Sequence, residues 1–282
     1  MPHFQAPDGT GLFYRDWGAG RPVVFVHGML MSSDMWQYQM LHLTENGFRA
    51  VACDRRGHGR SDDPGRGYEF DTLADDLAAL LNRMDLTDVT LVGHSMGGGE
   101  IVRYLSRHGD QRVAQIVLVG STVPKLNVDP EAGAALLDRF RTGYGQWVAE
   151  NAALSFGDGL PGCVIPQLEK EQAIRDWMDV SLQAAVACTA VNMPADFTSE
   201  LSKITVPALV VHGDHDAFAP LETCGQRSAE LIPDSRLVVY GNAAHMPHLS
   251  HRERLTADLL DFVRSGDVGQ SVARRQPAGR RA

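Results

Sequence analysis

The chain has 282 residues, of which 44% are hydrophobic, and its formal net charge at pH 7 is −9. This excess of acidic residues argues against nucleic acid as a partner, because phosphate backbones are themselves strongly negative. The sequence contains no apolar run long enough to span a bilayer, and its start lacks the basic and apolar segments of a secretory signal. We therefore expect a cytoplasmic protein that does not interact with membranes.

Hydrophobic periodicity predicts strands that alternate with helices along most of the chain. The predicted strands are 10–17, 22–27, 48–53, 89–93, 113–119, 206–212 and 236–240. The predicted helices are 35–45, 71–84, 96–108, 221–231 and 252–264. This alternation is typical of an α/β protein with a mostly parallel sheet.

A long helical stretch interrupts this alternation. It predicts a helical cap over residues 121–197, with residues 1–120 and 198–265 forming the core domain. Residues 266–282 combine Gly, Pro and Gln with paired arginines, which predicts a disordered basic tail. Ten large apolar side chains of the cap are candidates for contact with an acyl group: Leu136, Leu137, Phe140, Trp147, Leu154, Phe156, Trp177, Met178, Leu182 and Met193.

The most informative motif is a G-x-S-x-G that spans residues 93–97. It follows a predicted strand directly and precedes a predicted helix, which is the context of a nucleophile elbow. Outside that context the same letters would often be a chance match, because Gly and Ser are common. The position therefore indicates that Ser95 is a nucleophile.

A serine nucleophile needs a histidine base and an acid that orients it, and both are found after later predicted strands. Asp214 and Asp216 follow strand 206–212, and we favour Asp216 because Asp214, next to the turn, is better placed to hold its own loop. No carboxylate closely follows strand 113–119, the other usual location of the acid. His245 ends a loop of small residues and is the expected base. His248 and His251, near the last helix, are more simply solvated or supporting histidines.

An oxyanion hole requires two backbone donors aimed at the developing negative charge. One is expected to be the N–H of Met96, directly after the nucleophile, and the other the N–H of Met29, after the strand 22–27. His27 precedes this second loop and is expected to brace it without titrating.

These features resemble the α/β-hydrolase superfamily, and most closely the cofactor-free haloperoxidase, perhydrolase and aryl esterase group. The likeness is carried by the motifs at 53–61, 93–100 and 210–216, with weaker support at 195–198 and 255–260. It implies an α/β-hydrolase fold with a mostly parallel eight-stranded sheet flanked by helices and a helical cap inserted after strand 6. It also implies a metal-free and cofactor-free enzyme whose triad matches Ser95, Asp216 and His245.

Two departures from the family pattern affect the expected substrate. The family commonly has Trp and then Pro after His-Gly, and the proline is associated with perhydrolysis, whereas this chain has Met29 and Leu30. Ordinary ester hydrolysis is therefore the better expectation. Ala217 and Phe218 make the wall after the acid more apolar. The expected substrate-binding residues are Leu30, His94, Phe218 and Met246.

The sequence thus predicts a serine carboxylesterase that acts on a small hydrophobic ester or lactone. A perhydrolase that makes peracids with hydrogen peroxide is one alternative, and a non-catalytic ligand-binding receptor on the same fold is another. A metal site made of His212, Asp214, His215 and Asp216 is disfavoured, because adjacent strand residues point to opposite faces. The four cysteines, at 53, 163, 188 and 224, predict buried thiols. A homo-oligomer remains possible.

Overall fold

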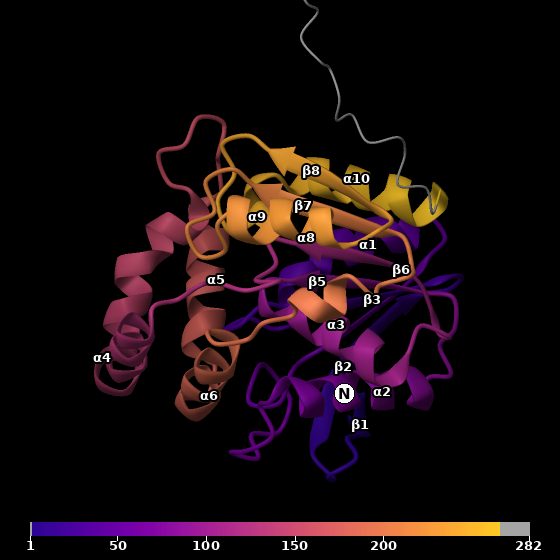
Figure 1. Ribbon diagram of the computed structural model, residues 1–282, viewed down its shortest axis with the longest axis horizontal. Coiled ribbons are helices and arrows are strands. Elements are labelled where there is room, and N and C mark those ends of the chain that lie inside the picture. The colour runs from indigo at the N-terminus through magenta and orange to yellow at the C-terminus, as the bar shows by residue number, and fades with distance from the viewer. Residues whose placement is uncertain (1, 266–282) are drawn as a thin grey trace, which may run out of the picture.

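The computed structural model describes residues 2–265 and contains one eight-stranded sheet (Figure 1). The strand order is β1-β2-β4-β3-β5-β6-β7-β8, and the pairs that involve β2 are antiparallel while all the others are parallel. The strands are β1 His3–Gln5, β2 Gly11–Gly18, β3 Pro22–Val26, β4 Arg49–Cys53, β5 Val89–His94, β6 Val113–Val119, β7 Ala208–Gly213 and β8 Ser235–Tyr240. The predicted fold class is therefore confirmed.

Ten α-helices occur in the part of the chain that the structure describes, together with two short helices of other types. The α-helices are α1 Gln37–Glu45, α2 Phe70–Arg83, α3 Met96–His108, α4 Pro130–Phe156, α5 Gln167–Met178, α6 Leu182–Asn192, α7 Thr198–Leu201, α8 Arg227–Leu231, α9 Pro247–Ser250 and α10 Arg252–Ser265. The 3₁₀ helix η1, Ser33–Trp36, leads into α1, and the π-helix η2, Glu222–Gln226, leads into α8.

Two layers of helices bury the two faces of the sheet. One apolar cluster joins the strands to α1 and α10, through side chains such as Met40 and Phe262. The other joins them to α2, α3 and the helices that follow β6, through side chains such as Leu77, Ile101 and Phe140. The central strands β3 and β5 are buried along their whole length, which fits the continuous apolar sequence of β3 and the mostly apolar sequence of β5.

The structure differs from the predicted elements at a few places. β1 was not located, because a three-residue edge strand is too short to show periodicity, and the four-residue α9 was missed for the same reason. The predicted helix 221–231 is a π-helix followed by a short α-helix, and the predicted helix 35–45 begins within the 3₁₀ helix. The remaining predicted elements agree with the structure to within two residues at each end.

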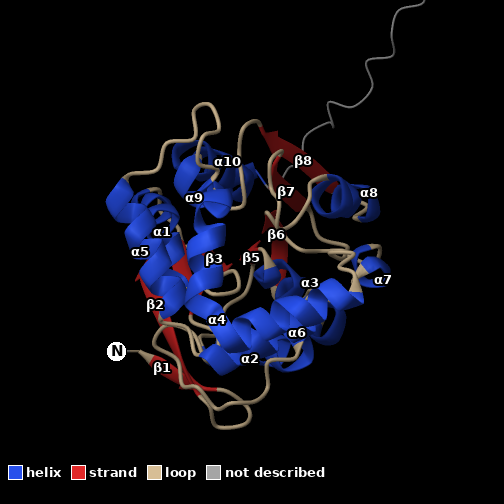
Figure 2. Ribbon diagram, turned by 90° about the vertical axis from the view of Figure 1, so that its left-hand side faces the viewer, coloured by secondary structure: helices blue, strands red, loops and turns tan. Residues whose placement is uncertain are grey.

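A helical insert, α4 to α6, lies between β6 and β7, after strand 6 as expected. Asp129 caps α4 by accepting hydrogen bonds from the N–H groups of Glu131 and Ala132. Figures 1 and 2 show the three helices grouped on one side of the sheet, where residues from several strand-following loops meet them. The division into a core domain and a separate cap stays a prediction, and the predicted basic tail lies outside the described residues. No described helix is long and apolar enough to cross a membrane.

Candidate active site

Ser95 lies in a sharp turn between β5 and α3. Its φ of 52° and ψ of −123° are unusual for a residue with a side chain, and its carbonyl accepts hydrogen bonds from Ser121 Oγ at 3.1 Å and from Thr122 N at 3.3 Å. The turn is also crowded. A Cβ on Gly93 would lie 2.7 Å from the carbonyl oxygen of Gly97, and a Cβ on Gly97 would lie 2.7 Å from that of Val26. The two glycines of the motif are therefore required by close backbone approach.

The structure brings Ser95, His245 and Asp216 together from the ends of β5, β8 and β7. His245 Nε2 lies 3.1 Å from Ser95 Oγ, and His245 Nδ1 lies 2.8 Å from Asp216 Oδ2. All three residues are more than nine-tenths buried. With the proton on Nδ1, the ring donates to the carboxylate and its Nε2 is free to accept the serine proton.

The carboxylate of Asp216 is fixed on both of its oxygens. Oδ1 accepts hydrogen bonds from the backbone N–H groups of Phe218, at 3.0 Å, and Ala219, at 2.9 Å, while Oδ2 faces His245. Burial opposes ionisation, but the interactions with His245 and His212 and the hydrogen bond from Ala219 N outweigh it and hold the pKa of Asp216 below its usual value. Asp214 instead holds its loop by accepting from Ala243 N at 3.3 Å.

Several of the predicted histidines have supporting positions. The ring of His94 is fully buried, donates from Nε2 to the carbonyl of His245 at 2.8 Å, and does not line the cavity next to Ser95. The expected substrate contact of His94 is therefore replaced by a role in holding the His245 loop. His248 is also buried rather than solvated, and burial lowers its pKa to about 3. His251 is partly exposed and lies against Tyr240.

The loop after β3 is braced from below and strained at one residue. His27 Nε2 accepts from Arg55 N at 2.9 Å, and burial holds the pKa of His27 well below its usual value, which fits a bracing residue that stays neutral. Leu30 has a φ of 64°, in the left-handed region that residues with side chains rarely adopt. Met96, as the first residue of α3, has an N–H that no helical carbonyl can accept.

A cavity of about 230 Å³ lies above Ser95 and His245, under the helical insert. Three of the four predicted substrate-binding residues line it, namely Leu30, Phe218 and Met246. Five of the ten apolar candidates from the insert also line it: Leu136, Phe140, Trp147, Trp177 and Met193. Of the other five, Leu154, Met178 and Leu182 are exposed to solvent, because they lie on the outward faces of their helices.

The cavity also has polar wall residues that the sequence did not single out. They are Thr122, after β6, and Asn151, Ser155, Thr189 and Asn192 on the insert. Most of their polar atoms are already engaged; for example, Thr122 Oγ1 donates to Asn192 Oδ1 at 3.1 Å. No sequence signal marks them, because only the packing of the insert turns them toward Ser95. Because most of these polar atoms are already hydrogen-bonded, the wall of the Ser95 cavity offers a substrate mainly apolar contacts.

The side chains that the structure describes contain no group of three or more His, Cys, Asp or Glu placed to hold a metal ion. The four cysteines have free thiols; Cys188 and Cys224 are buried as expected, whereas Cys53 and Cys163 are only partly buried. Burial raises the pKa of Cys188 to about 12, so this thiol is an apolar filler rather than a nucleophile.

Comparison with known proteins identifies the fold family. A sequence model described as the alpha/beta hydrolase fold matches residues 21–252. The chain belongs to this family. The hydrolase is 40% identical to a non-heme chloroperoxidase from Kitasatospora aureofaciens, over 93% of this chain and 99% of that protein. It is 35% identical to a bifunctional esterase/perhydrolase from Acinetobacter calcoaceticus, over 94% of this chain and all of that protein.

A solved esterase from Exiguobacterium antarcticum is similar to the hydrolase in three dimensions. The two structures superimpose with a TM-score of 0.89 at 31% sequence identity, and the match covers 93% of this chain and 99% of the esterase. These relatives support a hydrolytic enzyme and confirm the family that the sequence motifs indicated.

Proposed function

We propose that this hydrolase is a serine carboxylesterase, in which Ser95 is the nucleophile, His245 the base and Asp216 the acid that orients it. The observation that carries the proposal is the chain of two hydrogen-bond distances, 3.1 Å and 2.8 Å, that joins the three side chains at the floor of an apolar cavity. The strained turn at Ser95 supports it, since strain of this kind is typical of functional residues.

In the proposed mechanism Ser95 Oγ attacks the ester carbonyl while His245 Nε2 takes its proton. The negative charge that forms on the carbonyl oxygen is held by the N–H groups of Met29 and Met96, and ionised Asp216 stabilises the imidazolium. The tetrahedral intermediate collapses, and the alcohol leaves with the proton from His245. Water then attacks the acyl-enzyme with His245 as base, which releases the acid and restores the serine.

The cavity supports a small, hydrophobic acyl group. Its volume of about 230 Å³ is modest, and its wall includes aromatic side chains such as Phe140, Trp147 and Phe218. No arginine or lysine lines it to bind a phosphate or carboxylate, within the described part of the chain. Small neutral esters or lactones are the substrates that fit this wall.

Rates on a series of p-nitrophenyl esters test the proposal. Acetate and butyrate esters are expected to react faster than palmitate, because a long chain exceeds the cavity. Ser95→Ala should abolish turnover, and Ser106→Ala, which changes an exposed serine on the helix that follows Ser95, should not. Failure of the wild-type protein to turn over any ester would favour the receptor alternative, and full activity of Ser95→Ala would refute the assignment of the nucleophile.

Perhydrolysis is a second candidate, supported by the likeness to a protein named as an esterase/perhydrolase. Leu30 bears on the choice between the two reactions, because it stands where the related family commonly has the proline that is associated with perhydrolysis. Its φ of 64° gives the loop a shape that proline cannot adopt, which favours water over peroxide as the acyl acceptor. Peracetate formation from acetic acid and hydrogen peroxide, compared with ester hydrolysis by the same preparation, measures the preference.

A further inference from the structure

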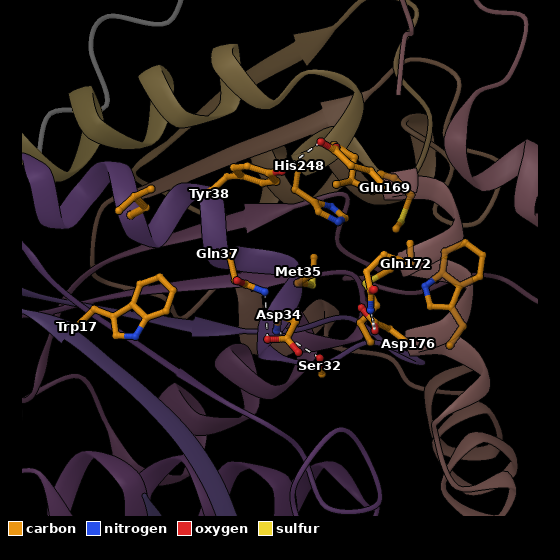
Figure 3. Close-up of a pocket in the computed structure, with 16 residues that line it drawn as sticks. Trp17, Ser32, Asp34, Met35, Gln37, Tyr38, Glu169, Gln172, Asp176 and His248 are labelled. Carbon is orange, nitrogen blue, oxygen red and sulfur yellow. Dashed lines mark hydrogen bonds between the residues drawn. The ribbon is translucent and has the colours of Figure 1, made fainter. Parts of the chain in front are cut away.

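A second cavity, of about 400 Å³, lies beside the cavity of Ser95 (Figure 3). Trp17 from β2 and Tyr38 from α1 line one part of it, and Trp177 from α5 lines another. Met31 and Met246 also line it, so the apolar part of the wall consists of aromatic rings and methionine side chains. The sequence motifs gave no sign of this cavity, because its walls come from segments far apart in the chain.

Three carboxylates line this second cavity, and two of them are paired with arginines. Asp34 forms salt bridges with Arg15 and Arg60, and the distance to Arg60 is 3.1 Å. Glu169 forms one with Arg252 at 3.0 Å. None of these arginines lines the cavity, so the positive charges lie behind the carboxylates rather than in the space itself.

The third carboxylate, Asp176, has no cation. It accepts one hydrogen bond, from Gln172 Nε2 at 2.7 Å, and it takes part in no salt bridge among the described residues. Burial raises the pKa of Asp176 and outweighs the hydrogen bond from Gln172, which lowers it; the charges of Asp34 and Asp179 raise the pKa further, against that of Arg175. A half-buried carboxylate in a negative field is stabilised by a cation brought into contact with it.

His248 also lines this cavity, as a buried and neutral side chain. Its side chain is 1% exposed, and its Nδ1 has no hydrogen-bond partner among the described residues. Figure 3 shows the ring between Tyr38 and Glu169, at the wall of the cavity. The ring is neutral at pH 7, with a pKa of about 3, and adds no positive charge.

We propose that the second cavity binds a hydrophobic organic cation, such as a quaternary ammonium compound or an alkylamine, with its charge against Asp176. An anion would meet three carboxylates there and no lining Arg or Lys of the described chain, and a neutral apolar ligand would bury Asp176 without a counter-charge, which is costly. The aromatic walls stabilise a cation through their ring faces as well.

The two cavities share the side chains of Met31, Trp177 and Met246 as a common wall. A cation in the second cavity therefore lies one side chain away from the space proposed for the substrate. It enters either as a free ligand or as the charged alcohol part of an ester, and in the second case one of these three side chains has to move aside so that the carbonyl reaches Ser95. The binding proposal holds for both sources and does not depend on the proposed ester hydrolysis.

Tryptophan fluorescence with two matched probes tests binding directly. Choline and 3,3-dimethylbutan-1-ol have nearly the same shape and differ in charge, so the full-length protein should bind choline at least about tenfold more tightly. Asp176→Asn should remove most of this preference, whereas Asp138→Asn, which changes an exposed aspartate of α4 outside the cavity, should keep it. Trp17→Leu, followed by calorimetry, gives a second variant and should weaken choline binding.

Equal affinity for the two probes, or a choline preference that survives Asp176→Asn, would overturn the proposal. The rates on acetylcholine and 3,3-dimethylbutyl acetate then separate the two sources. A higher kcat/KM for acetylcholine that is lost in Asp176→Asn supports a charged alcohol group, and equal values together with choline binding support a free ligand. Because binding is measured without turnover, Ser95→Ala protein gives the same answer even if the proposed activity fails.

Discussion

Replacing Asp216 by asparagine should disable the enzyme through the direction of one hydrogen bond. The two N–H groups that donate to Oδ1, from Phe218 and Ala219, will select the amide oxygen of the new side chain. The amide NH₂ must then face His245 Nδ1, which has to accept instead of donate. The ring proton moves to Nε2, the atom that lies 3.1 Å from Ser95 Oγ. The ring can no longer accept the proton of the serine.

We expect Asp216→Asn to lower kcat by about four orders of magnitude, which corresponds to about 5 kcal/mol. The free energy of unfolding should change by less than about 2 kcal/mol, because both backbone hydrogen bonds are retained. Initial rates on p-nitrophenyl acetate and urea unfolding measure the two quantities. Asp214→Asn is the matched control and should cost less than about tenfold in kcat, since Asp214 only holds a loop. A folded Asp216→Asn protein with kcat within tenfold of wild type would refute this reasoning.

Four further outcomes are expected. Ser95→Gly should be more stable than Ser95→Ala by about 1 to 2 kcal/mol in urea unfolding, because glycine tolerates the φ of 52°; equal stability would mean that the turn is unstrained. His245→Ala should lower kcat as much as loss of the serine does, and His248→Ala by about tenfold or less; the reverse ranking would show that the wrong histidine was chosen. Leu30→Pro should raise the ratio of peracetate to acetate by about two- to tenfold, since proline forces φ to about −65° and reorients the Met29 carbonyl. The control Leu30→Gly can keep the positive φ and should therefore keep the wild-type ratio. Equal ratios in the two variants would exclude this effect of the loop. Finally, the folded-state pKa of about 3 for His248 lies below the usual 6.5, so the unfolded chain binds the extra proton and stability falls as the pH drops from about 6.5 toward 3. His248→Gln should reduce this slope by up to about 1.4 kcal/mol per pH unit in urea unfolding between about pH 7 and 5, and an unchanged slope would show that His248 is protonated when folded.

The sequence predicted the sheet and the meeting of Ser95, Asp216 and His245 because both follow from local patterns. Apolar runs locate the central strands, and side chains that follow parallel strands meet at one edge of the sheet. The G-x-S-x-G motif is local in the same sense at Gly93, where the close approach is to Gly97 in the same turn, whereas Gly97 approaches Val26 of the distant strand β3.

Features that depend on long-range packing were not predictable in this way. Leu30 adopts a positive φ with no glycine to signal it, and its loop is held by the buried contacts of His27 and Arg55. His94 is expected from the sequence to contact the substrate, but its ring donates to the carbonyl of His245 and does not line the cavity. The second cavity is beyond sequence reasoning for the same reason, as Trp17 and Asp176 are separated by most of the chain.

The most direct test of the account is to identify the covalent acyl-enzyme. The protein would be mixed with p-nitrophenyl acetate, quenched in acid within the first turnover, and digested for mass spectrometry. We predict one acetyl group on the peptide that contains Ser95, and none on the same peptide from Ser95→Ala protein. Ester turnover without an adduct at Ser95, or with the acetyl group on another residue, would contradict the proposed mechanism.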